Sequence, residues 1–172
     1  MPTTETEQEF EERIREHELL LHKVCRMYAY TDADHKDLFQ DIVVQLWQAY
    51  PKFKGEAKFS TWLYRVSINT AISGRRKKKG FVITSDPLEL PVHHTDDEST
   101  HVEDEWRLQT LYKAIGHLNE VEKAIVMLYM EERSYEEMQD ILGITVGTLR
   151  VKMNRIREKL RNAAKTLDYG TK

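Results

Sequence analysis

Cysteine, glycine and proline are scarce in this chain of 172 residues, which has 1 Cys, 7 Gly and 4 Pro. The single cysteine, Cys25, excludes an intrachain disulfide, and its apolar neighbours are typical of a buried structural thiol. Few turn-forming residues and plentiful Leu, Glu, Lys and Arg predict a mostly helical protein. No run of about 18 apolar residues occurs, so we expect no membrane insertion. The acidic residues 1–12 lack the pattern of a signal peptide, which favours a cytoplasmic location.

The formal net charge of −3 hides a strong segregation of charge along the chain. Residues 52–80 contain nine Lys and Arg against one acid, and residues 145–165 contain seven against one. Residues 82–105 contain eight acids and no Lys or Arg. Two basic blocks of this kind are typical of a protein that binds nucleic acid. The simpler alternative is that they are only solvated helix faces.

Apolar residues recur at helical spacing in the first eighty residues and predict three helices. The first carries an apolar stripe at Phe10, Ile14, His17, Leu21, Val24 and Tyr28. The second is capped at residues 31–34 and ends at Pro51. The third opens at Ser60 and is closed by Gly74 and the basic run that follows it. Three such helices can bury one small core.

The helical pattern is lost after Gly80 and returns near residue 104. The intervening segment contains Pro87 and Pro91 among Ser, Thr, His and acids, which predicts a flexible acidic linker. A second helical unit then begins with a stripe at Leu108, Leu111, Ile115 and Leu118. We therefore predict an all-α chain with two small helical domains, residues 8–80 and 104–167, joined by the linker at 81–103.

The end of the second unit has the layout of a helix-turn-helix. Ser134 and Glu137 form a capping-box pattern, and Gly143 stands where that helix should stop. The last helix then has apolar residues on one side and basic residues opposite. Its N-terminal half must present the groups that reach base edges in duplex DNA. The candidates are Thr145, Thr148, Arg150, Val151, Lys152 and Arg155. A plain helical hairpin with a solvated basic face is the alternative.

The first basic block differs because aromatic residues lie among its cations. Phe53, Phe59, Trp62 and Tyr64 are interleaved with Lys and Arg between residues 52 and 65. Stacking surfaces combined with basic grooves bind single-stranded nucleic acid. Trp62 itself, at helical spacing from Val66, is expected to pack in the core.

Metal and catalytic interpretations have little support. His93, His94 and His101 lie in or beside the acidic linker, where we expect solvent exposure and no zinc binding. The chain has no glycine-rich phosphate loop, nucleophile elbow or HExxH motif. We therefore expect no cofactor and no enzymatic activity.

Three segments, in order, resemble the extracytoplasmic-function sigma factors of the sigma-70 family. Residues 37–47 (DLFQDIVVQLW) resemble the helix with which these proteins bind the polymerase clamp. Residues 59–66 (FSTWLYRV), followed by Asn69, Thr70 and Ala71, are similar to their promoter-melting helix. Residues 147–150 (GTLR) and 155–160 (RIREKL) resemble their minus-thirty-five recognition helix. The resemblance covers about residues 8–165.

The resemblance implies a sigma factor that binds core RNA polymerase, recognises promoter DNA and directs transcription initiation. It implies polymerase contacts at Asp37, Gln40, Asp41 and Gln45. Contacts to the single strand of the opened minus-ten element are implied at Lys58, Arg65, Asn69, Arg75 and Arg76. The last helix would enter the major groove of the minus-thirty-five element, and the acidic linker would thread the nucleic-acid channel of the polymerase. An anti-sigma factor is a further expected partner.

The chain also departs from the family pattern. Trp62-Leu63 stands where primary sigma factors have paired tryptophans, which implies weaker melting and stricter promoter dependence. Ser73 replaces a common Asp, and Val151 replaces a common small polar residue, so the base preference does not carry over.

Other protein classes remain as alternatives. A helix-turn-helix regulator acting without polymerase would not need the aromatic and basic surface of residues 52–80. An RNA-binding or polymerase-associated adaptor without promoter specificity would not need the helix-turn-helix. A metal-dependent enzyme would need zinc at His93 and His94.

Overall fold

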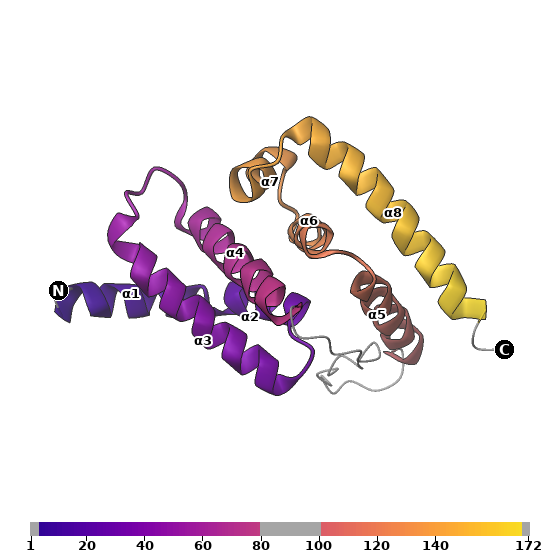
Figure 1. The fold of residues 1–172 in the computed structure, drawn as a ribbon, viewed down its shortest axis with the longest axis horizontal. Coiled ribbons are helices and arrows are strands. Elements are labelled where there is room, and N and C mark those ends of the chain that lie inside the picture. Colours follow the sequence, from indigo (N-terminus) through magenta and orange to yellow (C-terminus); the bar gives the residue numbers. More distant parts are fainter. Residues whose placement is uncertain (1–3, 80–100, 170–172) are drawn as a thin grey trace. The chain divides into compact units, whose positions relative to one another are not determined.

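In the computed structural model, the description covers residues 4–79 and 101–169, except for the side chains of residues 4–5, 76–79, 101–105 and 167–169. These residues form helices and connecting turns, with no strand among them (Figure 1). The all-α prediction is therefore confirmed. Residues 81–100 of the predicted acidic linker lie outside the described residues. None of the described helices combines the length and apolar character needed to cross a membrane.

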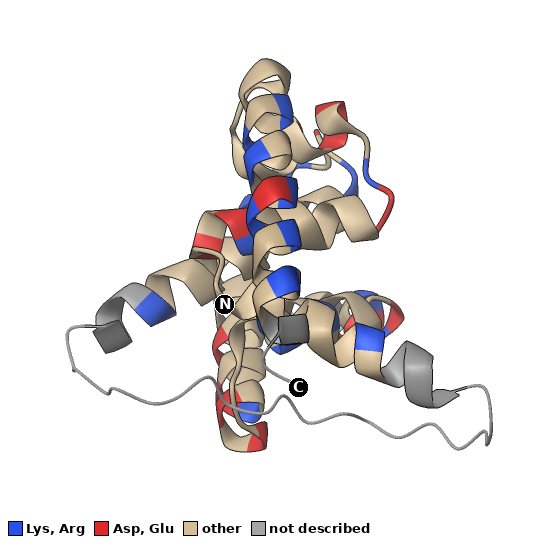
Figure 2. Ribbon diagram, turned by 90° about the vertical axis from the view of Figure 1, so that its right-hand side faces the viewer, with Lys and Arg blue, Asp and Glu red and all other residues tan. Residues whose placement is uncertain are grey.

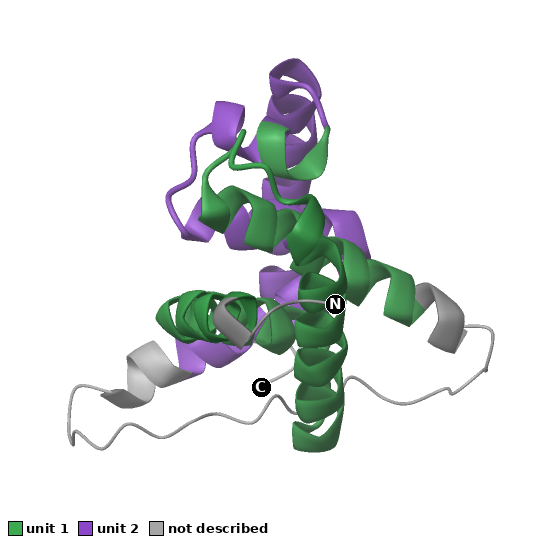
Figure 3. Cartoon of the chain, turned by 90° about the vertical axis from the view of Figure 1, so that its left-hand side faces the viewer, with its two compact units in different colours: residues 1–83, 140–143 green, residues 84–139, 144–172 purple. Residues whose placement is uncertain are grey.

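The chain divides into two compact units (Figure 3). One contains residues 1–83 with residues 140–143, and the other contains residues 84–139 and 144–172. The predicted boundaries 8–80, 81–103 and 104–167 remain predictions.

The first group of helices comprises α1 (Thr4–Glu16), α2 (Glu18–Tyr28), α3 (Asp32–Ala49), the 3-10 turn η1 (Tyr50–Lys52) and α4 (Phe59–Lys79). Helices α2, α3 and α4 pack against one another. Apolar side chains from all three form a core with almost no solvent exposure: Leu21, Val24, Ile42, Leu46, Leu63 and Ile68. Cys25 lies in this core, and burial raises the pKa of its thiol to about 12, so it stays protonated.

The expected first helix is two helices, because the chain turns at His17. In a continuous helix the His17 N–H would donate to the carbonyl of Arg13. Instead it donates to the carbonyl of Ile14 (3.1 Å), while Nδ1 of the His17 ring lies 2.9 Å from the Arg13 carbonyl oxygen. The side chain thus takes the place of the backbone donor. The prediction of a single helix was wrong.

The ends of α3 and α4 agree only in part with expectation. Thr31 caps α3, since its hydroxyl accepts from the Asp34 N–H (3.0 Å). Helix α3 ends at Ala49, and Pro51 lies in η1. Helix α4 already begins at Phe59 and continues through Gly74 to Lys79. Glycine lowers helix stability by only about 1 kcal/mol, so α4 continues through Gly74 and ends within the basic run that follows it.

The second group of helices comprises α5 (His101–Gly116), α6 (Glu120–Met130), α7 (Tyr135–Leu142) and α8 (Val146–Tyr169). Helix α8 packs against α5 and α6. Leu149, Met153 and Ile156 of α8 are buried, as their one-sided spacing predicts. The predicted stripe on α5 is only partly correct, because Leu108 is 46% exposed. Leu118 is buried but follows the end of the helix.

Candidate nucleic-acid interface

The turn between α7 and α8 is set by local sequence. At the start of α7, the Glu137 N–H donates to the Ser134 hydroxyl (3.1 Å). The Ser134 N–H donates in return to the Glu137 carboxylate (2.9 Å), which completes the predicted capping box. After the helix, Gly143 has φ +69, a left-handed conformation that favours glycine. A connection of only three residues, 143–145, therefore separates α7 from α8.

The N-terminus of α8 is capped by two side chains. The Thr148 N–H donates to the Thr145 hydroxyl (3.4 Å), and that hydroxyl donates to the Thr148 hydroxyl (2.9 Å). The Val146 N–H donates to the side-chain carbonyl of Gln139 (3.0 Å). Sequence reasoning missed Gln139, whose contact depends on how α7 and α8 meet. These bonds occupy two backbone N–H groups at the start of α8.

The predicted recognition residues do not share one environment on α8. Arg150, Val151 and Arg155 are exposed, as are Thr145 and Thr148. At about 100° per residue, Val151 lies roughly opposite the buried Leu149. Lys152 is half-buried instead, and it lies on the side of α8 that faces α6. Five of the six predicted residues are therefore exposed, and Lys152 is half-buried.

Two arginines of α8 rest on tyrosine rings. The Arg150 guanidinium lies 5.6 Å from the centroid of the Tyr135 ring, at the start of α7. The Arg157 guanidinium lies 5.2 Å from the Tyr129 ring and donates to the Tyr129 hydroxyl (2.9 Å). Such stacking limits the positions that a long side chain can take. Tyr135 thus constrains Arg150, a role that no sequence pattern indicated.

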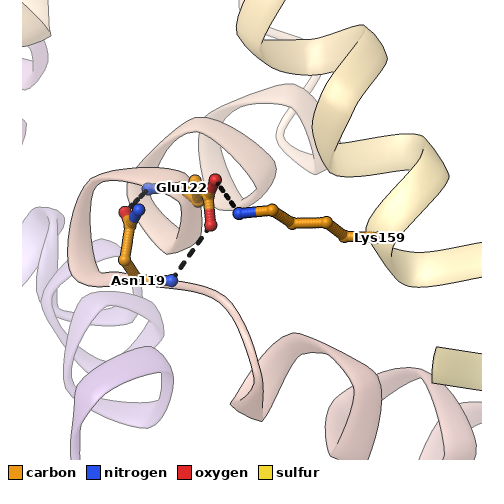
Figure 4. A network of polar contacts seen from close by, with 3 residues as sticks. All are labelled: Asn119, Glu122 and Lys159. Atoms are coloured by element: carbon orange, nitrogen blue, oxygen red, sulfur yellow. Dashed lines mark hydrogen bonds and ion pairs between the residues drawn. The ribbon is translucent and has the colours of Figure 1, made fainter. Parts of the chain in front are cut away.

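A charged network connects α8 to α6 (Figure 4). Lys159 Nζ lies 2.5 Å from the Glu122 carboxylate, and Glu122 also accepts from the Asn119 N–H (3.1 Å). The Glu122 N–H donates to the Asn119 side chain (2.9 Å), so Asn119 caps α6 as predicted. Burial alone would raise the pKa of Glu122. The hydrogen bonds from Lys159 and Asn119 and the charges of Lys159 and Lys152 outweigh burial and lower that pKa.

On α4, part of the predicted strand-binding set lies along one exposed side. Arg65 and Asn69 are exposed on α4, and their spacing of four residues places them on one side of the helix. Lys58 is also exposed and immediately precedes α4, seven residues before Arg65. Figure 2 shows that both basic (blue) and acidic (red) segments occur along the described helices. The side chain of Arg76 lies outside the described residues.

The Arg75 side chain contacts other residues of the protein, including Tyr28 and Tyr30. Its guanidinium donates to the Tyr28 carbonyl (3.1 Å) and to the Tyr30 hydroxyl, and it lies 4.2 Å from the centroid of the Tyr30 ring. These contacts connect the end of α4 to the turn between α2 and α3. The structure thus separates Arg75 from Lys58, Arg65 and Asn69.

The aromatic residues before and within α4 pack on one another. Trp62 is half-buried, and its ring centroid lies 5.1 Å from that of Phe53 and 5.4 Å from that of Phe59. Tyr50 lies 6.3 Å from Trp62 and 5.1 Å from Phe10 of α1. The cluster fixes the segment between η1 and α4. Trp62 therefore packs against neighbouring rings, as expected, although it is not fully enclosed.

On α3, the predicted polymerase contacts all face solvent. Asp37, Gln40, Asp41 and Gln45 are exposed, whereas Ile42 is buried. Among the described residues, no group of three His, Cys, Asp or Glu side chains could hold a metal ion. The side chains of His93, His94 and His101 lie outside the description.

Comparison with known sequences matches both halves of the chain to one family. The family Sigma-70 region 2 matches residues 13–81, and the family Sigma-70, region 4 matches residues 108–160. The ECF RNA polymerase sigma-E factor of Haemophilus influenzae is 31% identical over 145 residues, which cover 78% of this chain and 76% of the relative. The chain belongs to the extracytoplasmic-function sigma factors of the sigma-70 family.

A second relative supports this membership, and two solved structures share the fold. The sigma-E factor of Escherichia coli K12 is 29% identical over 162 residues, covering 85% of this chain and 83% of the relative. The sigma factor RpoE from Bartonella quintana has the same fold, with a TM-score of 0.71 at 20% identity over 92% of this chain and 98% of that chain. CnrH is also similar, with a TM-score of 0.65 at 19% identity over 93% of this chain and 90% of that chain.

As a sigma factor, the protein binds core RNA polymerase and promoter DNA and directs transcription initiation. Sigma factors are in general not enzymes. The two families match in the order that the sequence predicted, region 2 before region 4. A regulator that acts without polymerase is therefore not favoured.

Proposed function

We propose that three separate helix faces divide the work of this sigma factor. The outer face of α8 reads the duplex minus-thirty-five element. The exposed side of α4 follows the single strand of the opened minus-ten element. The solvent face of α3 binds the polymerase clamp. The observation that carries this proposal is the exposure of most predicted contact residues whose side chains the structure describes, with Lys152 and Arg75 as the exceptions.

On α8, Arg150 and Arg155 are the main base-reading residues. Both are exposed in the N-terminal half of the helix, and arginine can donate two hydrogen bonds to the major-groove edge of guanine. Thr145 caps the helix, and both Thr145 and Thr148 contact the phosphate backbone of the DNA beside it. Lys152, which lies toward Glu122, contributes charge to the edge of the surface.

Lys58, which immediately precedes α4, contacts the strand directly, as do Arg65, Asn69 and Arg76 of α4. Arg75 acts by holding the end of α4 against the turn at Tyr28 and Tyr30. On α3, Asp37, Gln40, Asp41 and Gln45 contact the polymerase. The exposure of all four supports this assignment.

We also propose an anti-sigma factor as a partner and the cytoplasm as the site of action. The solved RpoE is in complex with the anti-sigma factor NepR, and the solved CnrH is in complex with the cytosolic domain of CnrY. The acidic linker is expected to enter the nucleic-acid channel of the polymerase. Replacing its acids with serine should then impair initiation.

Two charge reversals separate the polymerase surface from the duplex surface. Asp41→Lys should weaken binding to core polymerase about tenfold or more, because it opposes the charge on an exposed contact face. Arg150→Glu should leave assembly unchanged and weaken promoter binding by roughly 5- to 150-fold, from the loss of about 1–3 kcal/mol. Fluorescence titration with core polymerase, then with promoters that the wild-type holoenzyme selects, measures both effects.

Matched controls are available on the same protein. Glu12→Lys reverses an exposed acid on α1, and Arg161→Glu reverses an exposed arginine farther along α8. Glu12→Lys should change the affinity for core polymerase by no more than about twofold, and Arg161→Glu should change the affinity for promoter DNA by no more than about twofold. Loss of core binding by Arg150→Glu, or normal core binding by Asp41→Lys, would contradict the proposed division.

A further inference from the structure

An exposed valine occupies the middle of the proposed DNA-reading face. Val151 is 52% exposed, and among the described residues it is the large apolar side chain of α8 that solvent reaches to this degree. Isolated exposed apolar residues are common on protein surfaces, so exposure alone carries little weight. Val151 is distinguished by its position on α8 and by the polar and basic character of its neighbours.

The position of Val151 follows from the buried face of the helix. Leu149, Met153 and Ile156 are buried and lie within one side of α8. At about 100° per residue, Val151 lies roughly opposite the centre of that side. In the N-terminal half of α8, Val151 is therefore the residue that lies most nearly opposite the buried side. A recognition helix contacts bases with this half.

The neighbours of Val151 on this face are polar or basic. Thr148 lies one turn before it, Asn154 and Arg155 lie one turn after it, and all three are exposed. Arg150 precedes it in sequence and is constrained by the Tyr135 ring. When such cations contact phosphates and guanines, the side chain between them is brought to the groove floor and loses its water. A valine in that position needs an apolar partner.

The major groove offers one such partner. Valine has no hydrogen-bond donor or acceptor, so it cannot read the polar edges of the bases. Thymine alone presents a methyl group there, at C5, and apolar side chains contact it. We propose that Val151 makes this chain select a thymine in the minus-thirty-five element by contact with its C5-methyl group. This inference rests on the proposed function of α8 and adds a base preference to it.

Exchange of thymine for deoxyuridine tests the contact, because it removes the methyl group alone. Holoenzyme made from the full chain and core polymerase is bound to duplexes that carry the selected promoter, with each thymine of the minus-thirty-five element replaced in turn. At one position the exchange should weaken wild-type binding by about three- to fivefold, as expected for one buried methyl group. The other positions should change by less than twofold.

Variants then assign that effect to Val151. Holoenzyme that carries Val151→Ser should bind the duplex with thymine and the duplex with deoxyuridine at that position equally well. Val151→Thr keeps one methyl group and should retain about a twofold preference. Leu108→Ser removes an exposed apolar residue from α5 and should leave the wild-type preference unchanged.

The outcomes separate the inference from the proposed function. If Arg150→Glu abolishes promoter binding but no exchange of thymine has an effect, the methyl contact is refuted and the proposed function stands. A sensitive thymine that remains sensitive in Val151→Ser also refutes it. If wild-type holoenzyme shows no dependence on the minus-thirty-five duplex, the proposed function of α8 fails, and the inference fails with it.

Discussion

Arginine side chains on α4 and α8 carry the same charge but occupy different environments. Arg155 is exposed, Arg150 lies over the Tyr135 ring, and Arg75 bonds to the Tyr28 carbonyl and lies over the Tyr30 ring. A count of charges along the sequence treats them alike. The role of each arginine therefore depends on which side of its helix it occupies, and this is visible only when the core is known.

The contacts of Arg75 predict a structural effect of a conservative change. Arg75→Lys keeps the positive charge but loses the planar group that reaches both the carbonyl and the ring. We expect a loss of about 1 kcal/mol in the free energy of unfolding, since the site is only partly buried. Thermal unfolding followed by circular dichroism measures it.

Arg26→Lys provides the control for this change. Arg26 is exposed on α2, so the same substitution there should leave the unfolding temperature unchanged. If Arg75→Lys unfolds like the wild-type protein but binds minus-ten single strands more weakly, Arg75 contacts DNA directly, and the internal contacts are unimportant.

At the scale of helices, the ends that rest on local chemistry are predictable from sequence. Thr31, Asn119 and Ser134 each cap a helix as expected, because a cap needs only a side chain and the first turn that follows it. Gly143 likewise takes the left-handed conformation expected after a helix. These features define where the helices begin and end without any long-range contact.

Helix interiors are less predictable, because the spacing of apolar residues does not reveal a side chain that competes with the backbone for a hydrogen bond. The period continues through His17, yet the His17 ring occupies the Arg13 carbonyl and the helix divides there. Leu108 fits the apolar stripe of α5 but is exposed, since neighbouring helices cover only part of that stripe. Gln139 caps α8 through a contact seven residues away.

The network between α6 and α8 predicts a stability that depends on pH. The folded protein lowers the pKa of Glu122, so the carboxylate stabilises the fold above the ordinary glutamate pKa of about 4.3. This contribution is lost as the pH falls below that value. Glu122→Gln should cost about 1–2 kcal/mol at pH 7, and the difference from wild type should narrow at pH 3.

Unfolding of both proteins across this pH range tests the prediction. Glu158→Gln, at an exposed position of α8, should match the wild-type protein at every pH. A penalty for Glu122→Gln that is the same at pH 3 and pH 7 would show that the charge of Glu122 does not stabilise the fold.

At the scale of the whole molecule, the order of the charge blocks and motifs was enough to predict the family. Both blocks fall within the matched regions, residues 13–81 and 108–160, apart from the last residues of the second block. The preferred promoter bases could not be predicted, because Val151 departs from the family pattern and its exposure follows from packing. The domain boundaries also remain predictions.

The most direct test of the account is transcription reconstituted from the purified chain and bacterial core polymerase on a genomic DNA library. The account predicts transcripts that start at a discrete set of sites, with loss of those transcripts for both Asp41→Lys and Arg150→Glu. Transcripts that are unchanged by Arg150→Glu, or duplex DNA binding that never directs the polymerase, would contradict the roles proposed for α8 and α3.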